Sequence, residues 1–337
     1  MLNYVNLNEW QSFVEGHPNR MIFHDQRWIV VLVSQYGFRL QIPTAKEGGE
    51  IVAGIPFLET TSIFGRKKLI SLPFTDTIRV LTRERSQSER LRKAIIDEIS
   101  NSYSAVVIRT DERLNGNVSN SEWVCHDLRT DQPFGAIETT LPSGLKRNLR
   151  KATRSDLKFE RKNDTNAMED FYRLHLMTRR KLGIPIQPRS FFRHVQQQII
   201  EPRLGFVGMV YQHGEPIAAG VFFVYNKTMT YKYGASHPRA LAERPNDFLF
   251  HNVIRIACDE GYHHFDFGIS KVREEGLRRF KQKWGAREIQ VHDDYLSGTG
   301  RLANDDSTSL KIASVVIRNT PSIVCRAVGE AFYRYSQ

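Results

Sequence analysis

Two short blocks in the second half of the chain carry residue types that could take part in acyl chemistry. In the first block, Asp266 stands between Phe265 and Phe267, two aromatic residues that we expect inside a sheet. A carboxylate in such a place must be paired or hydrogen-bonded. Asp266 could therefore act as a general base, or it could bond to N–H groups of the loop that follows, which is the commoner state of a buried carboxylate.

The second block places Lys281 directly after Phe280, in a segment that also carries three other cationic residues, Arg278, Arg279 and Lys283. An ammonium directed at a developing oxyanion stabilises the transition state of acyl transfer, and one such donor can be worth about 3 kcal/mol in a dry site. The same spacing also fits a basic helix face in solvent. The residues alone leave both interpretations open.

A third candidate is the junction between the segment Tyr231 to His237 and the segment Arg244 to Asp247. We expect a strand, a turn and a helix here. A helix that begins beside a strand end presents free N–H groups and a partial positive charge, which suit a pyrophosphate or a substrate phosphate. Every α/β unit contains such junctions, so this signal is weak by itself.

Several other kinds of site lack their usual patterns. The chain has 11 histidines, but none are spaced as metal ligands, and the adjacent His263 and His264 would point to opposite faces of a strand. The three cysteines are far apart and form no CxxC pair. A GxSxG turn and the glycine patterns of Walker and Rossmann sites are also missing. We therefore expect no metal, no disulfide framework and no serine or cysteine hydrolase.

The elements that must position these residues can be outlined from hydrophobic periodicity. Helices are predicted over 143–154, 167–182, 191–200 and 244–261, the last with Asn246 or Asp247 as its N-cap and Gly261 as its stop, and a strand is predicted over 262–268. A helix over 274–284 and a strand over 288–296 follow. In the first half, the clearest helix is 86–101, which leads into a strand over 105–109.

An internal repeat organises the chain. Gly49 to Phe57 is similar to Gly214 to Phe223. Each copy follows apolar runs, Trp28 to Val33 with Phe38 to Ile42 in the first case and Leu204 to Tyr211 in the second, which is the pattern of a β-hairpin. The 337 residues are also enough for two domains. We predict two copies of one α/β unit, at 1–135 and 136–300, and a separate tail at 301–337.

The charge favours an anionic partner. The chain has 48 Lys and Arg against 37 Asp and Glu, a net charge of +11. Much of it lies in Lys146 to Arg154, in Arg278 to Lys283 and in the tail. The longest apolar run is too short for a bilayer, so we expect a cytoplasmic protein. From Ser309 the tail is amphipathic and either attaches to the inner face of an anionic membrane or packs on the domain.

These blocks resemble the GNAT-related acyltransferase domain of the FemAB-like proteins, whose best-known members build peptidoglycan interpeptide bridges. The resemblance covers about residues 120–296. It lies in five ordered blocks: Leu145 to Ala152; Phe171 to Gly183; Gly214 to Gly220; Tyr233 to Ser236 with Pro245 and Asn246; and Phe265 to Gly268 with Phe280 to Gly285. The first half, including Gly65 to Phe74, resembles a degenerate copy. The resemblance implies an α/β (α+β) fold of tandem GNAT-like units, each a mixed, mostly antiparallel sheet flanked by helices.

The resemblance further implies transfer of an acyl or aminoacyl group to an amine through a tetrahedral intermediate. Lys281, with Phe280, matches the position that supports the reacting carbonyl, and Tyr233 matches an aromatic hydroxyl in the substrate channel. Arg180 matches a basic residue that contacts the acceptor's phosphate. We expect catalysis at Lys281, Phe280, Asp266 and Tyr233, and substrate or cofactor binding at Arg180, Ser236, Asn246, Asp76 and Arg147.

The donor is the least defined part of this prediction. The glycine-containing phosphate motif of ordinary acetyl-CoA enzymes is missing, because Arg244 to Leu249 occupies its place; the long coiled coil of many tRNA-dependent members is missing too. We expect an acyl-CoA-type thioester as cosubstrate, with no tightly bound cofactor. The amine acceptor would be a cell-envelope or exopolysaccharide precursor, either free or linked to a nucleotide or a lipid, or a related small molecule. Aminoacyl-tRNA is the alternative donor, and a non-catalytic binding protein on the same fold is the third hypothesis.

Overall fold

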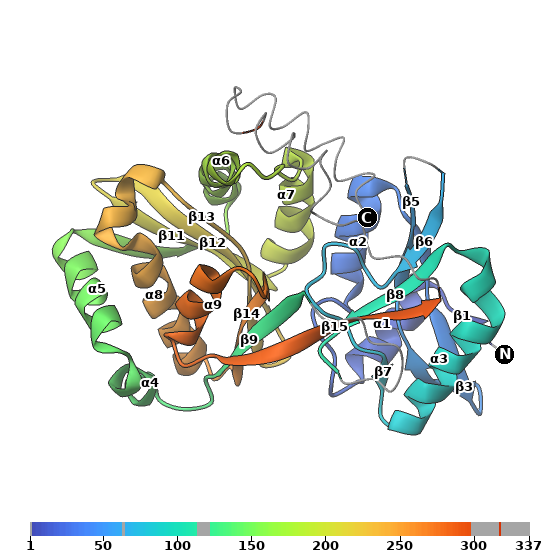
Figure 1. The fold of residues 1–337 in the computed structure, drawn as a ribbon. Helices are drawn as coiled ribbons and strands as arrows, with labels where there is room; N and C mark the ends of the chain where they lie inside the picture. The colour runs from blue at the N-terminus through green and yellow to red at the C-terminus, as the bar shows by residue number, and fades with distance from the viewer. Residues whose placement is uncertain (1, 63–64, 113–121, 298–316, 318–337) are drawn as a thin grey trace. The chain divides into compact units, whose positions relative to one another are not determined.

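The computed structural model describes residues 2–62, 65–112, 122–297 and 317 (Figure 1). Contacts divide these residues into two compact units. The first unit comprises residues 2–124 together with 290–297, and the second comprises residues 125–289 and Ile317. No helix in the described ranges is long and apolar enough to cross a membrane. The predicted tail, 301–337, lies outside the described residues except for Ile317.

The first unit contains three helices and two sheets among its described residues. Its elements are β1 (Asn3–Tyr4), α1 (Leu7–Glu15), α2 (Gln26–Tyr36), β2 (Arg39–Gln41), β3 (Pro43–Glu47), β4 (Glu50–Gly54), β5 (Phe57–Thr61), β6 (Lys67–Ile70), β7 (Leu81–Thr82), α3 (Arg85–Ile99), the 3₁₀ turn η1 (Ser100–Ser102) and β8 (Ala105–Thr110). One sheet has the order β1-β3-β4-β7, and the other contains β8-β6-β5-β2. From Gln290 onward, β15 (Arg287–Ser297) also belongs to this unit and pairs with β8.

The apolar run from Trp28 to Val33 was expected to form a strand, and this expectation is wrong. It lies inside α2, which begins after Asp25, whose carboxylate accepts a hydrogen bond from the Arg27 N–H, and ends at Gly37 in the left-handed conformation. The six apolar residues of the run cover every side of the helix, with Val30 and Val33 only half-buried, so the run shows no polar face and looks like a buried strand. The cap residues identify the helix better than the apolar run does.

The second unit is built on a sheet with the order β10-β11-β12-β13-β14-β9. Its elements are β9 (Trp123–Arg129), α4 (Phe134–Thr140), α5 (Ser143–Arg154), β10 (Leu157–Lys162), α6 (Thr165–Leu182), α7 (Arg189–Val195), the π-helical turn η2 (Gln196–Ile200), β11 (Gly205–Gln212), β12 (Glu215–Tyr225), β13 (Thr228–Ser236), the 3₁₀ helix η3 (Pro238–Glu243), α8 (Pro245–Asp259), β14 (His264–Lys271), α9 (Glu275–Gln282) and the start of β15. The strands from β10 to β13 pair antiparallel, whereas β13 and β14 are parallel. Helices α6 and α7 cover one face, and α5, α8 and α9 lie on the other (Figure 1).

A pair of glycines lets α8 approach the centre of this sheet. Gly208 and Gly220 lie opposite each other on β11 and β12. A Cβ atom at Gly220 would lie 2.7 Å from the ring of Phe222, and one at Gly208 would lie 3.1 Å from Leu249 of α8. The missing side chains therefore make room for Phe222 and Leu249, which belong to the hydrophobic core of the second unit.

The internal repeat is visible in both units. The hairpins β3-β4 and β11-β12 are antiparallel and turn at glycines with positive φ, Gly48 and Gly49 in one and Gly214 in the other. Each unit then has a strand, a helix and a second strand parallel to the first: β6-α3-β8 and β13-α8-β14. The prediction of two α/β units, each with mixed strand pairing and flanking helices, is confirmed.

Candidate active site

The parallel strands β13 and β14 separate along their length. They pair only from Thr228 to Thr230 on β13 and from His264 to Asp266 on β14. Both strands continue, to Ser236 and to Lys271, but no further ladder pairing joins them, although the structure describes every residue of both. The facing edges beyond Asp266 therefore have main-chain groups that do not bond across the sheet. This opening is the centre of the candidate site.

Asp266 shapes the strand at the point where the separation begins. Its Oδ1 accepts a hydrogen bond from the N–H of Gly268 at 2.8 Å. Gly268 has a φ of 67°, which bends β14 in a way that a side chain would strain. The half-buried carboxylate thus holds an unusual backbone turn. This bond is the structural role that the sequence left open beside that of general base.

Lys281 lies behind the same turn. The residue is 2% exposed, and its Nζ donates to the carbonyl oxygens of Gly268 at 2.8 Å and Ile269 at 3.1 Å. A buried ammonium requires such acceptors, because desolvation without compensation is costly. Lys281 is therefore not part of a solvent-exposed basic helix face, which was the second interpretation of this segment.

The surroundings of Lys281 are strongly polar. His126 of β9 is fully buried, and its Nε2 lies 3.2 Å from Oε2 of Glu288. Burial, followed by the positive charge of Lys281, lowers the pKa of His126 to about 4. Arg278 donates two bonds of 2.8 Å to the Glu288 carboxylate and holds the pKa of Glu288 low. His126 is consequently neutral at ordinary pH.

Phe280 belongs to a second contact group, at the start of α8. Its ring packs against Phe250 of α8, and Nζ of Lys283 lies 4.2 Å from the ring centroid. The same Nζ donates to Oδ1 of Asp247 at 2.5 Å, and Asn148 of α5 donates to the other carboxylate oxygen at 2.8 Å. The buried Asp247 therefore ties α5 and the end of α9 to the first turn of α8.

Tyr233 lies on the α6 and α7 side of the sheet. Its ring contacts those of Phe191, Phe192 and His175, with centroid distances of 6.0, 5.3 and 6.2 Å. The two nitrogens of His175 lie 3.4 Å from the Gly234 carbonyl and 3.3 Å from Oε1 of Gln187. Burial, and then the charge of Arg179, lowers the pKa of His175 to about 3, so this histidine remains neutral.

Ser236 bonds to helix α6, and Arg180 belongs to that helix. Ser236, at the end of β13, exchanges two main-chain hydrogen bonds with Oγ1 of Thr178, at 3.1 and 3.2 Å. Arg180 lies in the last turn of α6, where its guanidinium is exposed. Within the second unit, Ser236 is thus anchored through its backbone, whereas Arg180 is available to a ligand.

The start of α8 differs from the predicted cap at Asn246 or Asp247. The N-cap is Arg244 in the left-handed conformation, with φ 60°, followed by Pro245 in the first turn; no side chain caps the helix. Arg244 and Arg239 of the preceding η3 are exposed, and neither has an ion-pair partner in the described part of the chain. Half-buried Asn246 lies beside them. The junction therefore combines an uncapped helix start, which leaves N–H groups free, with two exposed arginines close to it along the chain.

A further group of free cations lies on α5. Arg147, Arg150 and Arg154 are exposed and have no acidic partner within the described residues, whereas Leu145 and Ala152 face the core. The spacing of three and four residues places the three arginines on one helix face. Arg147 is therefore one member of a basic stripe, which we define as Arg147, Arg150 and Arg154.

Asp76 lies in the first unit, in the irregular segment between β6 and β7, and is half-buried. The other candidate residues all belong to the second unit. There, one group gathers around Gly268 (Asp266 and Lys281), one around Asp247 (Phe280 and Asn246), and one beside α6 (Tyr233 and Ser236). Arg239 and His175 were not selected from the sequence, although His175 lies within the block from Phe171 to Gly183. Arg244 and Asp247 belonged to the junction considered as a third candidate, but neither was selected there as a site residue.

Comparisons with known proteins agree with this architecture. Residues 143–282 match the acetyltransferase (GNAT) domain family. The crystal structure of FemX aligns with a TM-score of 0.70 at 13% identity, covering 87% of this chain and 96% of that one. The C-terminal domain of a putative lysylphosphatidylglycerol synthetase from Agrobacterium fabrum aligns at 0.59 and 14% identity, covering 93% and 96%. A tandem GNAT protein from the clavulanic acid biosynthesis pathway aligns at 0.51 and 10% identity, covering 89% and 100%. The search of curated proteins found no match.

Proposed function

We propose that the domain matched by the acetyltransferase (GNAT) family, residues 143–282, transfers an acyl group from a thioester of the acyl-coenzyme A type to an amine. The observation that carries this proposal is the opening between β13 and β14, which has a helix start with free N–H groups close along the chain. An extended donor needs both features: strand edges that bind its amide groups and a positively charged site for its phosphates.

The strand edges can bind the extended arm of the donor. A chain with amide groups can bond to main-chain N–H and C=O groups in the way that an added strand does. Lys281 and Asp266 support this edge, because each bonds directly to main-chain atoms of the turn at Gly268. In this proposal, their first task is to hold the turn of β14 in the shape that receives the donor.

The start of α8 can bind the phosphates of the donor. Arg239 and Arg244 supply unpaired positive charge beside the uncapped helix start. The carboxylate of Asp247 in the first turn would repel an anion, but Lys283 neutralises it at 2.5 Å. The junction therefore keeps a net positive character without the glycines of ordinary acetyl-CoA enzymes.

The reaction would follow the usual course of acyl transfer. The neutral amine attacks the thioester carbonyl, a tetrahedral intermediate forms, and the carbon–sulfur bond breaks to give an amide and a free thiol, with one proton passing from the amine to the thiolate. The ammonium of Lys281 lies in a buried setting, where a positive charge stabilises an oxyanion more strongly than in water. We propose an acceptor with a phosphate group, contacted by Arg180, of the kind found in envelope or polysaccharide precursors.

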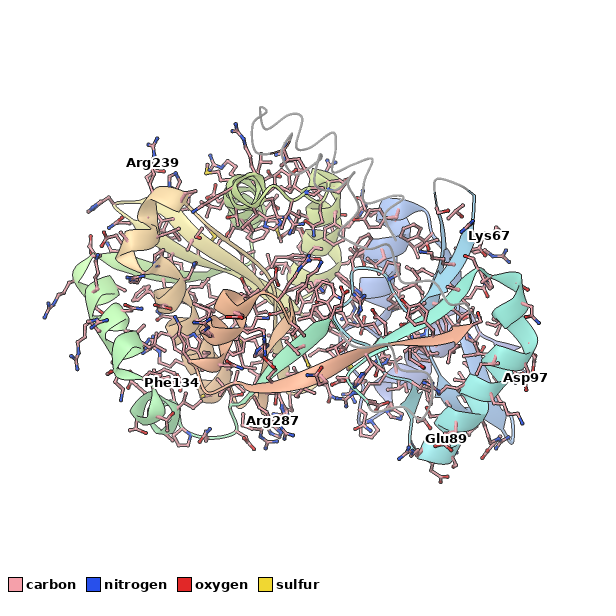
Figure 2. The ribbon with its side chains drawn as sticks, viewed as in Figure 1. Lys67, Glu89, Asp97, Phe134, Arg239 and Arg287 are labelled. Carbon is pink, nitrogen blue, oxygen red and sulfur yellow. The ribbon has the colours of Figure 1, made fainter. Side chains whose placement is uncertain are left out.

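Binding and turnover with acetyl-CoA and longer acyl-CoAs test this proposal. The Arg239→Gln and Arg244→Gln double variant should weaken acyl-CoA binding about tenfold or more, because it removes two charges from the phosphate place. Arg287→Gln is the matched control, since Arg287 is also exposed and lies apart from Arg239 in Figure 2. Failure of the wild-type protein to bind any acyl-CoA would refute the proposal.

The basic stripe on α5 favours a second candidate, an aminoacyl-tRNA donor. Three unpaired arginines on one face suit a run of phosphates. If tRNA is the donor, its affinity should fall steeply with salt, and Arg147→Gln with Arg150→Gln and Arg154→Gln should reduce that salt slope. If charged tRNA does not bind at low salt, this candidate is excluded, while the first is unaffected.

A further inference from the structure

The first unit has a cavity of its own, beside one face of α3. Its volume is about 690 Å³, within the range of small-molecule sites. It is lined by the segment from Arg79 to Arg85 and by one face of the helix, which includes Ser88, Glu89, Arg92, Lys93 and Ile96, with Asn19 and Glu112 completing it. Figure 2 labels Glu89 and Asp97 on this helix. Every lining residue belongs to the first unit.

The charges of the lining are only partly neutralised. Five Arg and Lys residues line the cavity against three Glu residues. Arg79 is bound by Asp111, at 2.5 Å for the closer oxygen, and Arg85 pairs with Glu89 at 3.1 Å. Arg83 and Lys93 are exposed and have no ion-pair partner in the parts of the chain that the structure describes. These two cations are therefore available to an anion.

Arg92 adds a buried donor. Its side chain is 12% exposed, and its Nη2 pairs with the buried Asp294. Its other terminal nitrogen, Nη1, is buried and has no hydrogen-bond partner among the described atoms. An unmet donor of a charged group is costly, so such a group usually meets a ligand or an ordered water. This nitrogen is closed to solvent, so a phosphate oxygen can accept from it only after the Arg92 side chain turns toward the cavity that it lines.

The cavity lies beside the helix of the first unit that corresponds to α8 in the internal repeat. Its lining includes the segment before α3 and one face of the helix as far as Ile96; α3 joins the parallel strands β6 and β8, as α8 joins β13 and β14 in the second unit. Val80, Leu81 and Ile96 provide an apolar part of the wall, and Ile96 is 41% exposed. The lining thus combines cations with apolar surface, as a phosphate ester with a hydrophobic or aromatic part would require.

We infer that the first unit binds a phosphate-bearing small molecule of about nucleotide size in this cavity. Arg83 and Lys93 contact the phosphates, Arg92 joins them when its side chain turns to present Nη1, and the apolar part of the ligand lies on Val80 and Ile96. This site belongs to the first unit alone and does not depend on the proposed acyl transfer. The unit that lacks the family motifs thereby has a binding function of its own.

The test uses the full chain, with inorganic pyrophosphate and ADP as probes in calorimetric titrations. The Arg83→Gln and Lys93→Gln double variant should weaken binding of ADP about tenfold or more. Arg90→Gln is the matched control, because Arg90 lies on the same helix, pairs with Glu47 and does not line the cavity; it should change the affinity less than twofold. Arg92→Lys keeps the charge and removes the forked donor, so it should weaken binding with little change in melting temperature.

Hydrogen exchange locates the bound probe. ADP should slow exchange in peptides that cover residues 79–96, and this protection should persist in the Arg239→Gln and Arg244→Gln variant, whose changes lie in the second unit. Absence of binding by both probes, or equal affinity in the wild type and the Arg83→Gln and Lys93→Gln variant, would overturn the inference. Loss of acyl transfer alone would not affect it.

Discussion

Nζ of Lys281 lies 2.8 Å from the carbonyl oxygen of Gly268 and 3.1 Å from that of Ile269, so one buried ammonium holds two successive carbonyls of β14. Lys281→Met would leave both carbonyls without this donor. We expect a loss of about 2 kcal/mol or more in the free energy of unfolding, measured by urea denaturation. Lys281→Arg keeps the charge and should lose less.

The same variants separate structure from chemistry. If the ammonium supports the reacting carbonyl, Lys281→Met should lower kcat by tenfold or more beyond any effect on KM, even at temperatures where the variant is fully folded. An unchanged kcat in folded Lys281→Met would restrict Lys281 to its bonds with β14. An unchanged stability would contradict the role of those bonds.

Asp247 and Lys283 provide a second prediction. Their pair, at 2.5 Å, is buried on the Asp247 side, with the side chains 5% and 25% exposed. Lys283→Met leaves the carboxylate without its cation, so we expect a destabilisation of about 3 kcal/mol. Asp247→Asn in the same chain should restore much of this loss, because a neutral amide is cheaper to bury. A double-mutant cycle by thermal or urea unfolding measures the coupling, and additive effects would contradict it.

Much of the organisation of the fold could be predicted from the sequence. The resemblance of Gly49 to Phe57 and Gly214 to Phe223 reflects hairpins in both units, because a turn with positive φ requires glycine or a similar residue. The run from Trp28 to Val33 was misjudged, since its six consecutive apolar residues hide the helical periodicity. The sequence also did not predict where α8 begins. Its N-cap residue is Arg244 in the left-handed conformation, which arginine rarely adopts.

The sequence identified candidate site residues by type but not by their contacts. The sequence indicated that Asp266 and Lys281 matter, but it could not show that both bond to the turn at Gly268, because that contact depends on the packing of α9 against β14. The roles of Asp247 and His175 depend on partners on other elements, Lys283 with Asn148 and Gln187 with Gly234. Such contacts between distant residues leave no local pattern.

His24 should make the protein sensitive to acid. Its Nδ1 accepts from the Met21 N–H at 3.0 Å, so the ring hydrogen lies on Nε2, 2.9 Å from the Arg79 carbonyl. Burial lowers the pKa of His24 from 6.5 to about 4. Between these values the unfolded chain binds a proton that the folded protein does not, so stability falls as the pH drops from about 6.5 to about 4.

The His24 contribution amounts to about 3 kcal/mol over that range. His24→Gln should flatten the decline in the free energy of unfolding between pH 7 and pH 4, measured by urea denaturation at several pH values. His263→Gln, at an exposed position, serves as the control and should leave the profile unchanged. An identical acid profile for His24→Gln and the wild type would contradict the prediction.

Gly234 is the position on β13 where a side chain is least tolerable. A Cβ atom there would lie 1.6 Å from the hydroxyl oxygen of Tyr231 and 2.6 Å from its Cζ. Tyr231 cannot move freely, because its ring packs against Phe250 with a centroid distance of 4.8 Å. Gly234→Ala should therefore cost about 1–3 kcal/mol of stability.

A matched pair of variants makes the Gly234 prediction specific. Tyr231→Phe removes the nearest atom, so Gly234→Ala should be less damaging in that background than in the wild type. Gly144→Ala is the control, because nothing lies within 4 Å of its Cβ position and it sits in α5; it should be neutral or stabilising. Tyr233 directly precedes Gly234, and Ser236 follows it by two residues. Gly234→Ala should therefore also raise KM for the acyl donor. Equal costs of Gly234→Ala in the Tyr231→Phe and wild-type backgrounds would show that the hydroxyl is not the obstacle.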